Sequence, residues 1–199
     1  MRRLNLRLSL DIILGALSHP RKVVEELINL RLGEIVILQA TLFVAICSTI
    51  LTYFFLQIIS NQVSGTVSDS NDLLNEVLSY VSLIQPIYFT ANQVFQMLIF
   101  AVIITVGGKM FNGKGTFFEA LICITMVEAV LTLLKLVQLI LVPFSAVLAF
   151  LVIIPGAIWS LWAFASSAAF IHGFRSTLLT FCGGFILCLL FLVSLNIFF

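Results

Sequence analysis

The stretch FFEALICITMVEAVLTLLKLVQLILV, residues 117–142, decides the fold of this chain. A bilayer core about 30 Å thick needs roughly 20 apolar residues of helix, and this stretch is longer than that. Its apolar residues are continuous rather than alternating, which favours a helix over a barrel strand. Two ionisable residues, Glu128 and Lys135, interrupt it. The stretch therefore predicts a membrane-spanning helix that carries one acid and one base.

The composition of the whole chain agrees with a lipid environment. Of its 199 residues, 61% are hydrophobic and 10% are charged, whereas soluble domains carry about 25% charged residues. Ten Lys and Arg against nine Asp and Glu leave a net charge of +1, which argues against nucleic acid as a partner. The expected partners are the lipid bilayer and another membrane protein or a second copy of this chain.

Four more apolar runs are long enough to cross a bilayer. The predicted fold is an all-α, polytopic transmembrane bundle of five helices with an N-terminal cytoplasmic amphipathic helix. Residues 1–33 form the predicted head, and residues 34–199 form the membrane domain. Neither piece of the fourth run around Pro155 is long enough to cross alone, so we predict one kinked helix there. The predicted spans are 35–59, 86–106, 117–142, 144–171 and 177–199.

Basic residues that flank short loops predict the orientation, because cytoplasmic loops carry an excess of Lys and Arg. They occur before the first span, between the second and third, and between the fourth and fifth, whereas residues 60–85 have acidic residues and no basic one. We therefore expect a cytoplasmic N-terminus and, after an odd number of spans, a C-terminus on the opposite side of the membrane. These basic residues are Arg2, Arg3, Arg7, Arg21, Lys22, Arg31, Lys109, Lys114 and Arg175.

The head has an amphipathic pattern between residues 20 and 30. Val23, Val24, Leu27 and Ile28 recur at helical spacing, and charged residues fill the other face. This pattern is typical of a helix lying in the cytoplasmic interface. It fits a helix packed against the cytoplasmic ends of the bundle equally well, and a docked protein partner is a third interpretation.

Glu128 and Lys135 are the costliest residues in the chain, since each charge near the bilayer centre costs about 2.5–3.5 kcal/mol. Seven residues separate them, so they share one helix face with Thr125 and Thr132, and that face must look into the bundle. Seven residues span about 10.5 Å, so we expect water or amides to lie between the two charges. The second span offers amides at similar depth, namely Gln85, Asn92, Gln93 and Gln96.

This polar seam has three interpretations. It is interhelical glue that fixes which faces meet, or a proton or ion relay or small polar pocket, or a contact for lipid headgroups or a partner. The sequence leaves all three open.

The loop between the second and third spans contains Gly107, Gly108, Gly113, Lys114 and Gly115. Its spacing approaches G-x-x-x-x-G-K, but no Ser or Thr follows the lysine and no strand precedes it, so nucleotide binding is not expected. We expect the first two glycines to end one helix and the next two to make a tight reversal. Thr116 then caps the third helix, with Glu119 in its first turn.

The sequence shows no recognisable set of catalytic residues. No serine has a His and Asp arrangement near it in the sequence, and no paired carboxylates share one face. His172, close to Arg175 at the cytoplasmic end of the fourth helix, is interpreted as an interfacial residue rather than a metal ligand, since His19 is the only other histidine. We predict no enzyme activity, no metal and no cofactor.

Three stretches and the predicted topology resemble one known family. The stretches are Pro20-Arg21-x-Val23-Val24, the loop Gly113-Lys114-Gly115-Thr116-Phe117-Phe118-Glu119-Ala120-Leu121, and Trp159 and Trp162 followed by His172-Gly173-Phe174-Arg175-Ser176. With five spans, this pattern resembles the Yip-one domain family over nearly the whole chain. The resemblance implies binding of Rab-type GTPases and a role in vesicle traffic for eukaryotic members. The short head and compact loops look more like a prokaryotic member, so the resemblance implies a place in the bacterial cytoplasmic (inner) membrane.

We therefore expect a non-enzymatic membrane protein that acts in membrane organisation or partner scaffolding. The competing class is a small transporter or an ion- or proton-conducting protein centred on Glu128, Lys135 and the amides of the second span. A lipid-remodelling role of the head is a third hypothesis.

Overall fold

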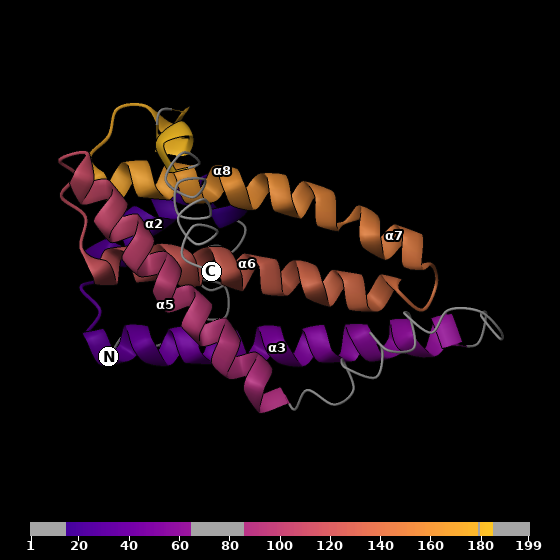
Figure 1. Ribbon diagram of the computed structural model, residues 1–199. Helices are drawn as coiled ribbons and strands as arrows, with labels where there is room; N and C mark the ends of the chain where they lie inside the picture. The colour runs from indigo at the N-terminus through magenta and orange to yellow at the C-terminus, as the bar shows by residue number, and fades with distance from the viewer. Residues whose placement is uncertain (1–14, 65–85, 179, 185–199) are drawn as a thin grey trace, which may run out of the picture.

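The computed structural model describes residues 15–64, 86–178 and 180–184, and all of its regular structure there is helical. Figure 1 shows the arrangement of the helices. The labelled helices are α2 (Pro20–Asn29), α3 (Glu34–Ser64), α5 (Pro86–Met110), α6 (Phe117–Leu141), α7 (Ala146–Leu151) and α8 (Ile153–His172).

Four stretches of the described chain are long and apolar enough to cross a membrane, namely Glu34–Ile59, Pro86–Met110, Phe117–Leu141 and Val147–His172. They confirm the first four predicted spans, with boundary shifts of a few residues. The predicted fifth span, 177–199, lies mostly outside the described residues. The protein is therefore an integral membrane protein whose described part contains four candidate spans.

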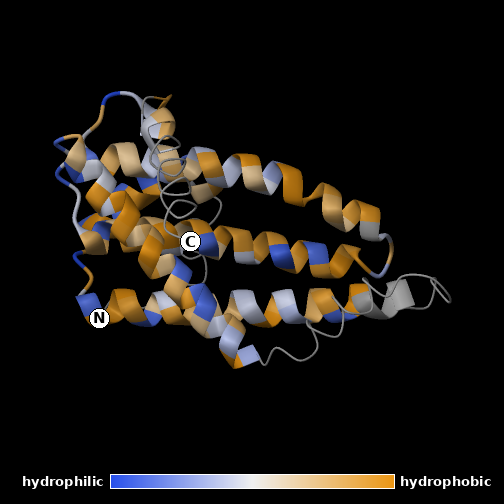
Figure 2. Ribbon diagram, viewed as in Figure 1, coloured by the Kyte–Doolittle hydropathy of each residue, from blue (hydrophilic) through white to orange (hydrophobic). Residues whose placement is uncertain are grey.

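Helix α6 is the centre of the bundle and contacts each of the other labelled helices. Leu121 and Val127 are fully buried on it, among a run of small and branched side chains from Ala120 to Val130. The outer helices present large apolar side chains instead, such as Phe43, Phe95 and Ile158. Figure 2 shows that apolar residues dominate the bundle helices. Such an outward apolar surface is the one that a bilayer solvates.

Helices α7 and α8 together form one candidate span with a break at Val152. The break has a local cause, because Pro155 has no N–H to donate to the carbonyl of Leu151 one turn earlier. The span begins at Ser145, whose Oγ accepts from the Leu148 N–H at 3.4 Å. The prediction of one kinked helix in this region is confirmed.

The described part of the head packs against the bundle. Val23 and Val24 of α2 are buried, and α2 contacts both α6 and α8, between which it lies in Figure 1. The guanidinium of Arg21 lies 5.5 Å from the centroid of the Phe170 ring. Just before α2, the Leu17 carbonyl accepts a hydrogen bond of 2.9 Å from the indole N–H of Trp159.

This last contact places the head beside the helices rather than beyond their ends. Trp159 is about 20 Å along α8 from His172 at 1.5 Å per residue, near the middle of the α7–α8 span. The described residues 15–29 thus pack against the bundle, while the position of the head relative to the membrane interface stays a prediction. The apolar face of α2 is covered by protein.

One end of the bundle carries four exposed basic residues of the described chain, and we call it the basic end. Arg31, Lys109, Lys114 and Arg175 lie there, at the start of α3, the end of α5, the start of α6 and the end of α8, and all four are exposed. The turn at Pro143 marks the opposite end, which we call the far end. Figure 2 shows hydrophilic segments gathered at the basic end.

Candidate functional site

The two intramembrane charges of α6 meet one hydroxyl from α3. The Lys135 Nζ lies 3.2 Å from the Glu128 Oε1, which is a direct ion pair. Ser48 Oγ donates to the same Glu128 oxygen at 2.7 Å and accepts from Lys135 Nζ at 2.5 Å. The three side chains form a closed cluster, which we call the α3–α6 triad.

Burial of the triad is uneven. Ser48 is buried, and the side chains of Glu128 and Lys135 are 13% and 29% exposed. The carboxylate thus lies deeper than the ammonium, whose flexible stem places it beside the Ser48 hydroxyl. Opposite charges held together in this way offset part of the cost of removing each from water.

A second polar contact lies closer to the basic end. Thr41 Oγ1 of α3 and Thr125 Oγ1 of α6 are 2.8 Å apart, and Thr41 also donates to the Ile37 carbonyl. Ala45, between Thr41 and Ser48 on the same face, is fully buried. Small side chains on this stripe let α3 approach α6 closely enough for hydroxyl groups to bridge them.

The structure corrects two expectations about the seam. Glu128 and Lys135 are in direct contact, because both long side chains bend toward Ser48 and close the gap along the helix. The partner helix is α3 rather than α5. Among the described residues, the Glu128 carboxylate and the Lys135 ammonium have no α5 amide as a partner: Asn92 and Gln96 are exposed and Gln93 is half-buried. Gln85 lies outside the described residues.

The α5 amides miss the charges because another face of α5, lined by small residues, packs against the bundle. Its buried residues Met97, Ala101, Thr105 and Gly108 form one stripe in the half of the helix nearest the basic end. Small residues there allow close approach to the bundle and turn the amides outward. Thr132, the last expected seam residue, donates to the Glu128 carbonyl of its own helix at 2.7 Å and joins no other helix.

Sequence reasoning missed Thr41 and Ser48. A signal was present, since Thr41, Ala45, Ser48 and Thr52 recur every three or four residues within the first span and form a small, polar stripe. The seven-residue spacing between Thr41 and Ser48 equals the spacing between Thr125 and Thr132 on α6.

A second cluster forms at the basic end, around His172. The Gly115 N–H donates to His172 Nδ1 at 3.1 Å, and His172 Nε2 lies 3.0 Å from the Ile104 carbonyl oxygen. Only a neutral imidazole with its proton on Nε2 satisfies both bonds, because Nδ1 must accept and Nε2 must donate. The Phe174 ring stacks on the imidazole, with centroids 5.5 Å apart.

Three glycines make room for this imidazole. A Cβ placed on Gly108 would lie 2.0 Å from His172 ring atoms, and one on Gly113 or Gly115 would lie 2.4 Å or 2.7 Å away. His172 is only 4% exposed, because the glycine loop encloses it at the end of α8, and its expected depth at the membrane interface stays a prediction. We call this arrangement the His172 clasp. Arg175 is exposed.

The loop reverses the chain differently from the expectation. Gly107 and Gly108 lie inside α5, which continues to Met110. The turn is made by Asn112 with φ 60°, while the Gly113 N–H donates to the Gly108 carbonyl at 2.8 Å. Asparagine tolerates this left-handed conformation and ends a helix as glycine does.

The cap of α6 is confirmed. Thr116 Oγ1 accepts from the Glu119 N–H at 3.4 Å, and the Glu119 carboxylate accepts from the Thr116 N–H at 2.7 Å. This reciprocal pair is a capping box. It fixes the start of α6 directly after Gly115, and so holds the clasp and the central helix in register.

Among the residues that the structure describes, no three His, Cys, Asp or Glu side chains are close enough together to hold a metal ion. Both ring nitrogens of His172 are engaged, and the Glu128 oxygen nearest Lys135 accepts two hydrogen bonds. The geometry of both clusters therefore serves to join helices.

These features define the class of the protein: a polytopic helical membrane protein whose polar residues join its helices. Residues 14–197 match the family described as the Yip1 domain, and the chain belongs to that family. No curated protein matches the chain, and no solved structure does.

The structure brings together the three stretches that carry the family resemblance. Arg21 of the head reaches Phe170 near the end of α8. Gly115 of the loop binds His172, and Trp159 binds the segment before α2. Stretches far apart in sequence thus form one continuous contact from the clasp along α8.

We expect Glu128→Gln or Lys135→Met to destabilise the folded protein by about 3–5 kcal/mol, because each leaves the other charge buried without a partner. The double variant carries no uncompensated charge and should recover much of this loss. Thermal unfolding in detergent, followed by circular dichroism, measures all three. Equal destabilisation by the double and the single variants would contradict the direct pairing.

We expect Gly108→Ala to destabilise the protein by roughly 1–3 kcal/mol, since the new methyl group overlaps the His172 ring. Gly33→Ala is the matched control, because a Cβ at Gly33 meets no atom within 4 Å. The midpoint of thermal unfolding reports both. A Gly108→Ala midpoint equal to that of the control would show that the clasp does not constrain the ring.

Proposed function

We propose that this Yip1 domain protein is a non-enzymatic membrane organiser that holds other membrane proteins against its exposed helix faces. The observation that carries the proposal is a pair of amides on α5. Asn92 and Gln96, one helical turn apart, are exposed within the first half of the candidate span Pro86–Met110, beside the exposed side chains of Phe95 and Ile99.

Exposing such amide side chains to lipid costs free energy, because lipid tails offer them no hydrogen-bond partner. An amide group without a hydrogen-bond partner in an apolar medium costs about 1–3 kcal/mol by protein mutational data. Amides from a neighbouring helix would satisfy these groups, and interhelical hydrogen bonds of this kind hold membrane helices together. Exposed apolar residues on both sides would supply the packing surface. The proposed occupant is a helix of another membrane protein or of a second copy of this chain.

The remaining polar groups support the same interpretation. The α3–α6 triad is closed by its own hydrogen bonds, and the His172 clasp uses both ring nitrogens. A conducting pathway needs groups that exchange protons or ions, whereas Ser48 and both ring nitrogens of His172 bond within their own clusters. We place the basic end in the cytoplasm of a bacterial cell on the positive-inside rule.

We expect Asn92→Leu with Gln96→Leu to weaken association with a second copy about three- to thirtyfold, the range set by interhelical hydrogen bonds of about 0.6–2 kcal/mol. Co-purification of two differently tagged copies from mild detergent measures this. Gln93→Leu, which removes a half-buried amide from another face of α5, is the control. If the double variant associates as the wild type does, and its captured membrane partners are also unchanged, the proposal fails.

We expect liposomes containing the wild-type protein to pass protons and small ions no faster than protein-free liposomes. A pH-sensitive dye trapped inside the liposomes measures proton flux under an imposed gradient. A flux that Glu128→Gln abolishes, in a variant that still folds, would instead establish the transport alternative.

A further inference from the structure

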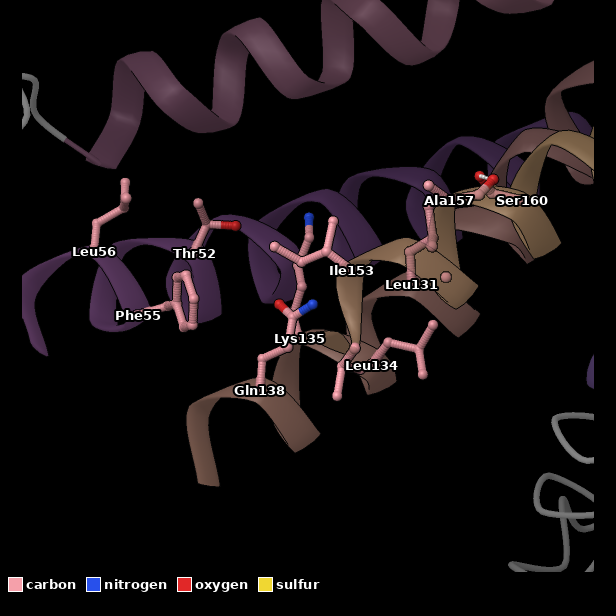
Figure 3. A pocket seen from close by; sticks show the side chains of 12 residues that line it. Thr52, Phe55, Leu56, Leu131, Leu134, Lys135, Gln138, Ile153, Ala157 and Ser160 are labelled. Carbon is pink, nitrogen blue, oxygen red and sulfur yellow. Dashed lines mark hydrogen bonds between the residues drawn. The ribbon is translucent and has the colours of Figure 1, made fainter. Parts of the chain in front are cut away.

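A cavity of about 430 Å³ lies beside the α3–α6 triad, toward the far end of the bundle. Its walls come from three helices, with Thr52 and Phe55 on α3, Leu131, Lys135 and Gln138 on α6, and Ala157 on α8 (Figure 3). Helix α6 forms the floor, and α3 and α8 stand on either side of it. This volume is within the range of sites for small molecules, about 300–1,000 Å³.

The cavity is long and faces the membrane side of the bundle. It extends along α6 from Leu131 to Gln138, two helical turns. Phe55 of α3 meets Phe150 of α7 edge to face, with ring centroids 6.1 Å apart, and this contact joins the two walls near the far end. Ala157 and Ile153 on its rim are both exposed, so the cavity is open sideways between α3 and α8.

The chemistry of the lining selects the occupant. Most lining side chains are apolar, and a buried water needs two to four polar partners. Lipid tails, in contrast, surround the bundle, and a tail in the cavity gains dispersion contacts that an unfilled space forfeits. An elongated apolar cavity that opens toward the bilayer therefore fits an acyl chain.

The polar groups of the cavity lie where the head end of a lipid chain would be. Gln138 is three residues from the end of α6, or about 4.5 Å along the axis. Because α6 is about 37 Å long against a hydrocarbon core of about 30 Å, this position is near the boundary between acyl chains and headgroups. Lys135 lies one turn deeper.

Both side chains have donors to offer. Lys135 uses two of its three N–H groups on Ser48 and Glu128, and the third has no acceptor among the described residues. The Gln138 side-chain amide likewise has no partner there, and both residues line the cavity. Donors at this depth match an ester carbonyl oxygen of a glycerophospholipid.

We propose that this cavity binds one acyl chain of a membrane glycerophospholipid, with an ester carbonyl of that chain accepting hydrogen bonds from Gln138 and Lys135. The site is independent of the α5 surface, so it stands or falls apart from the scaffolding function.

Photocrosslinking tests the position of the chain. The full-length protein is reconstituted in nanodiscs of phosphatidylcholine that include a phosphatidylcholine with a diazirine in its acyl chain. After irradiation, mass spectrometry maps the labelled peptides. We expect the label to concentrate on residues 52–56, 131–138 and 153–160, the segments that line the cavity. Label spread over α3, α5 and α8 in proportion to exposure would overturn the proposal.

A variant that fills the cavity with a side chain tests the proposal, and the same substitution at the adjacent position is its control. Ala157→Phe places a ring in the cavity, and we expect it to reduce labelling of residues 131–138 about tenfold, because the ring and the chain compete for the same volume. Ile158→Phe puts the same ring on the adjacent position, which does not line the cavity, and should leave labelling unchanged. Unchanged labelling in Ala157→Phe would overturn the proposal. Ser160→Leu repeats the test should Ala157→Phe fail to fold.

The carbonyl contact has its own readout. Unlabelled diacyl phosphatidylcholine should compete for the site better than the dialkyl ether analogue, which lacks the carbonyl oxygens. Gln138→Leu should reduce this preference, since only the Lys135 donor then remains, while it leaves the unfolding midpoint unchanged. Equal competition by the two lipids in the wild-type protein would contradict the assigned hydrogen bond.

Discussion

A carboxylate placed inside a bilayer must find a positive charge and hydrogen-bond donors, or the helix that carries it does not stay in lipid. In this protein the requirement is met by Lys135 on the same helix and by Ser48 on a neighbour. Glu128 and Lys135 lie on the same helix, so their ion pair alone would not fix how α6 is rotated relative to its neighbours. The bond to Ser48 of α3 does fix it. Because Ser48 bonds to both charges, the triad fixes which face of α3 meets α6, and the Thr41–Thr125 contact extends the same interface toward the basic end.

Length and hydropathy were sufficient to predict the four candidate spans, because a helix that crosses the bilayer needs a continuous apolar stretch of about 20 residues, and such stretches are rare outside membranes. The kink before Pro155 and the cap at Thr116 also followed from local chemistry. The Ser48 hydroxyl partner of Glu128 could not be predicted from the sequence. Depth along a helix is readable from sequence, but the direction in which a neighbouring helix faces depends on packing, and the small stripe of α5 turned Asn92 and Gln96 away from the charges.

The His172 clasp shows the same limit. Glycine clusters in loops usually indicate reversal of the chain, and part of this loop does reverse it. Two of the three glycines that contact the imidazole, Gly108 and Gly115, are explained instead by the volume of a side chain from another helix. His172, 57 positions from Gly115 and 64 from Gly108, sets their identity, and no local pattern contains that information.

The bond from the Trp159 indole to the Leu17 carbonyl has a consequence for truncation experiments. Residues 15–29 pack against the side of the bundle, so we expect them to behave as part of the cooperative folding unit rather than as a detachable arm. Cutting the chain after α2 would strip the cover from α6 and leave an indole donor facing hydrocarbon. A phenotype of such a deletion would report collapse of the membrane domain before it reported any lost activity of the N-terminus itself.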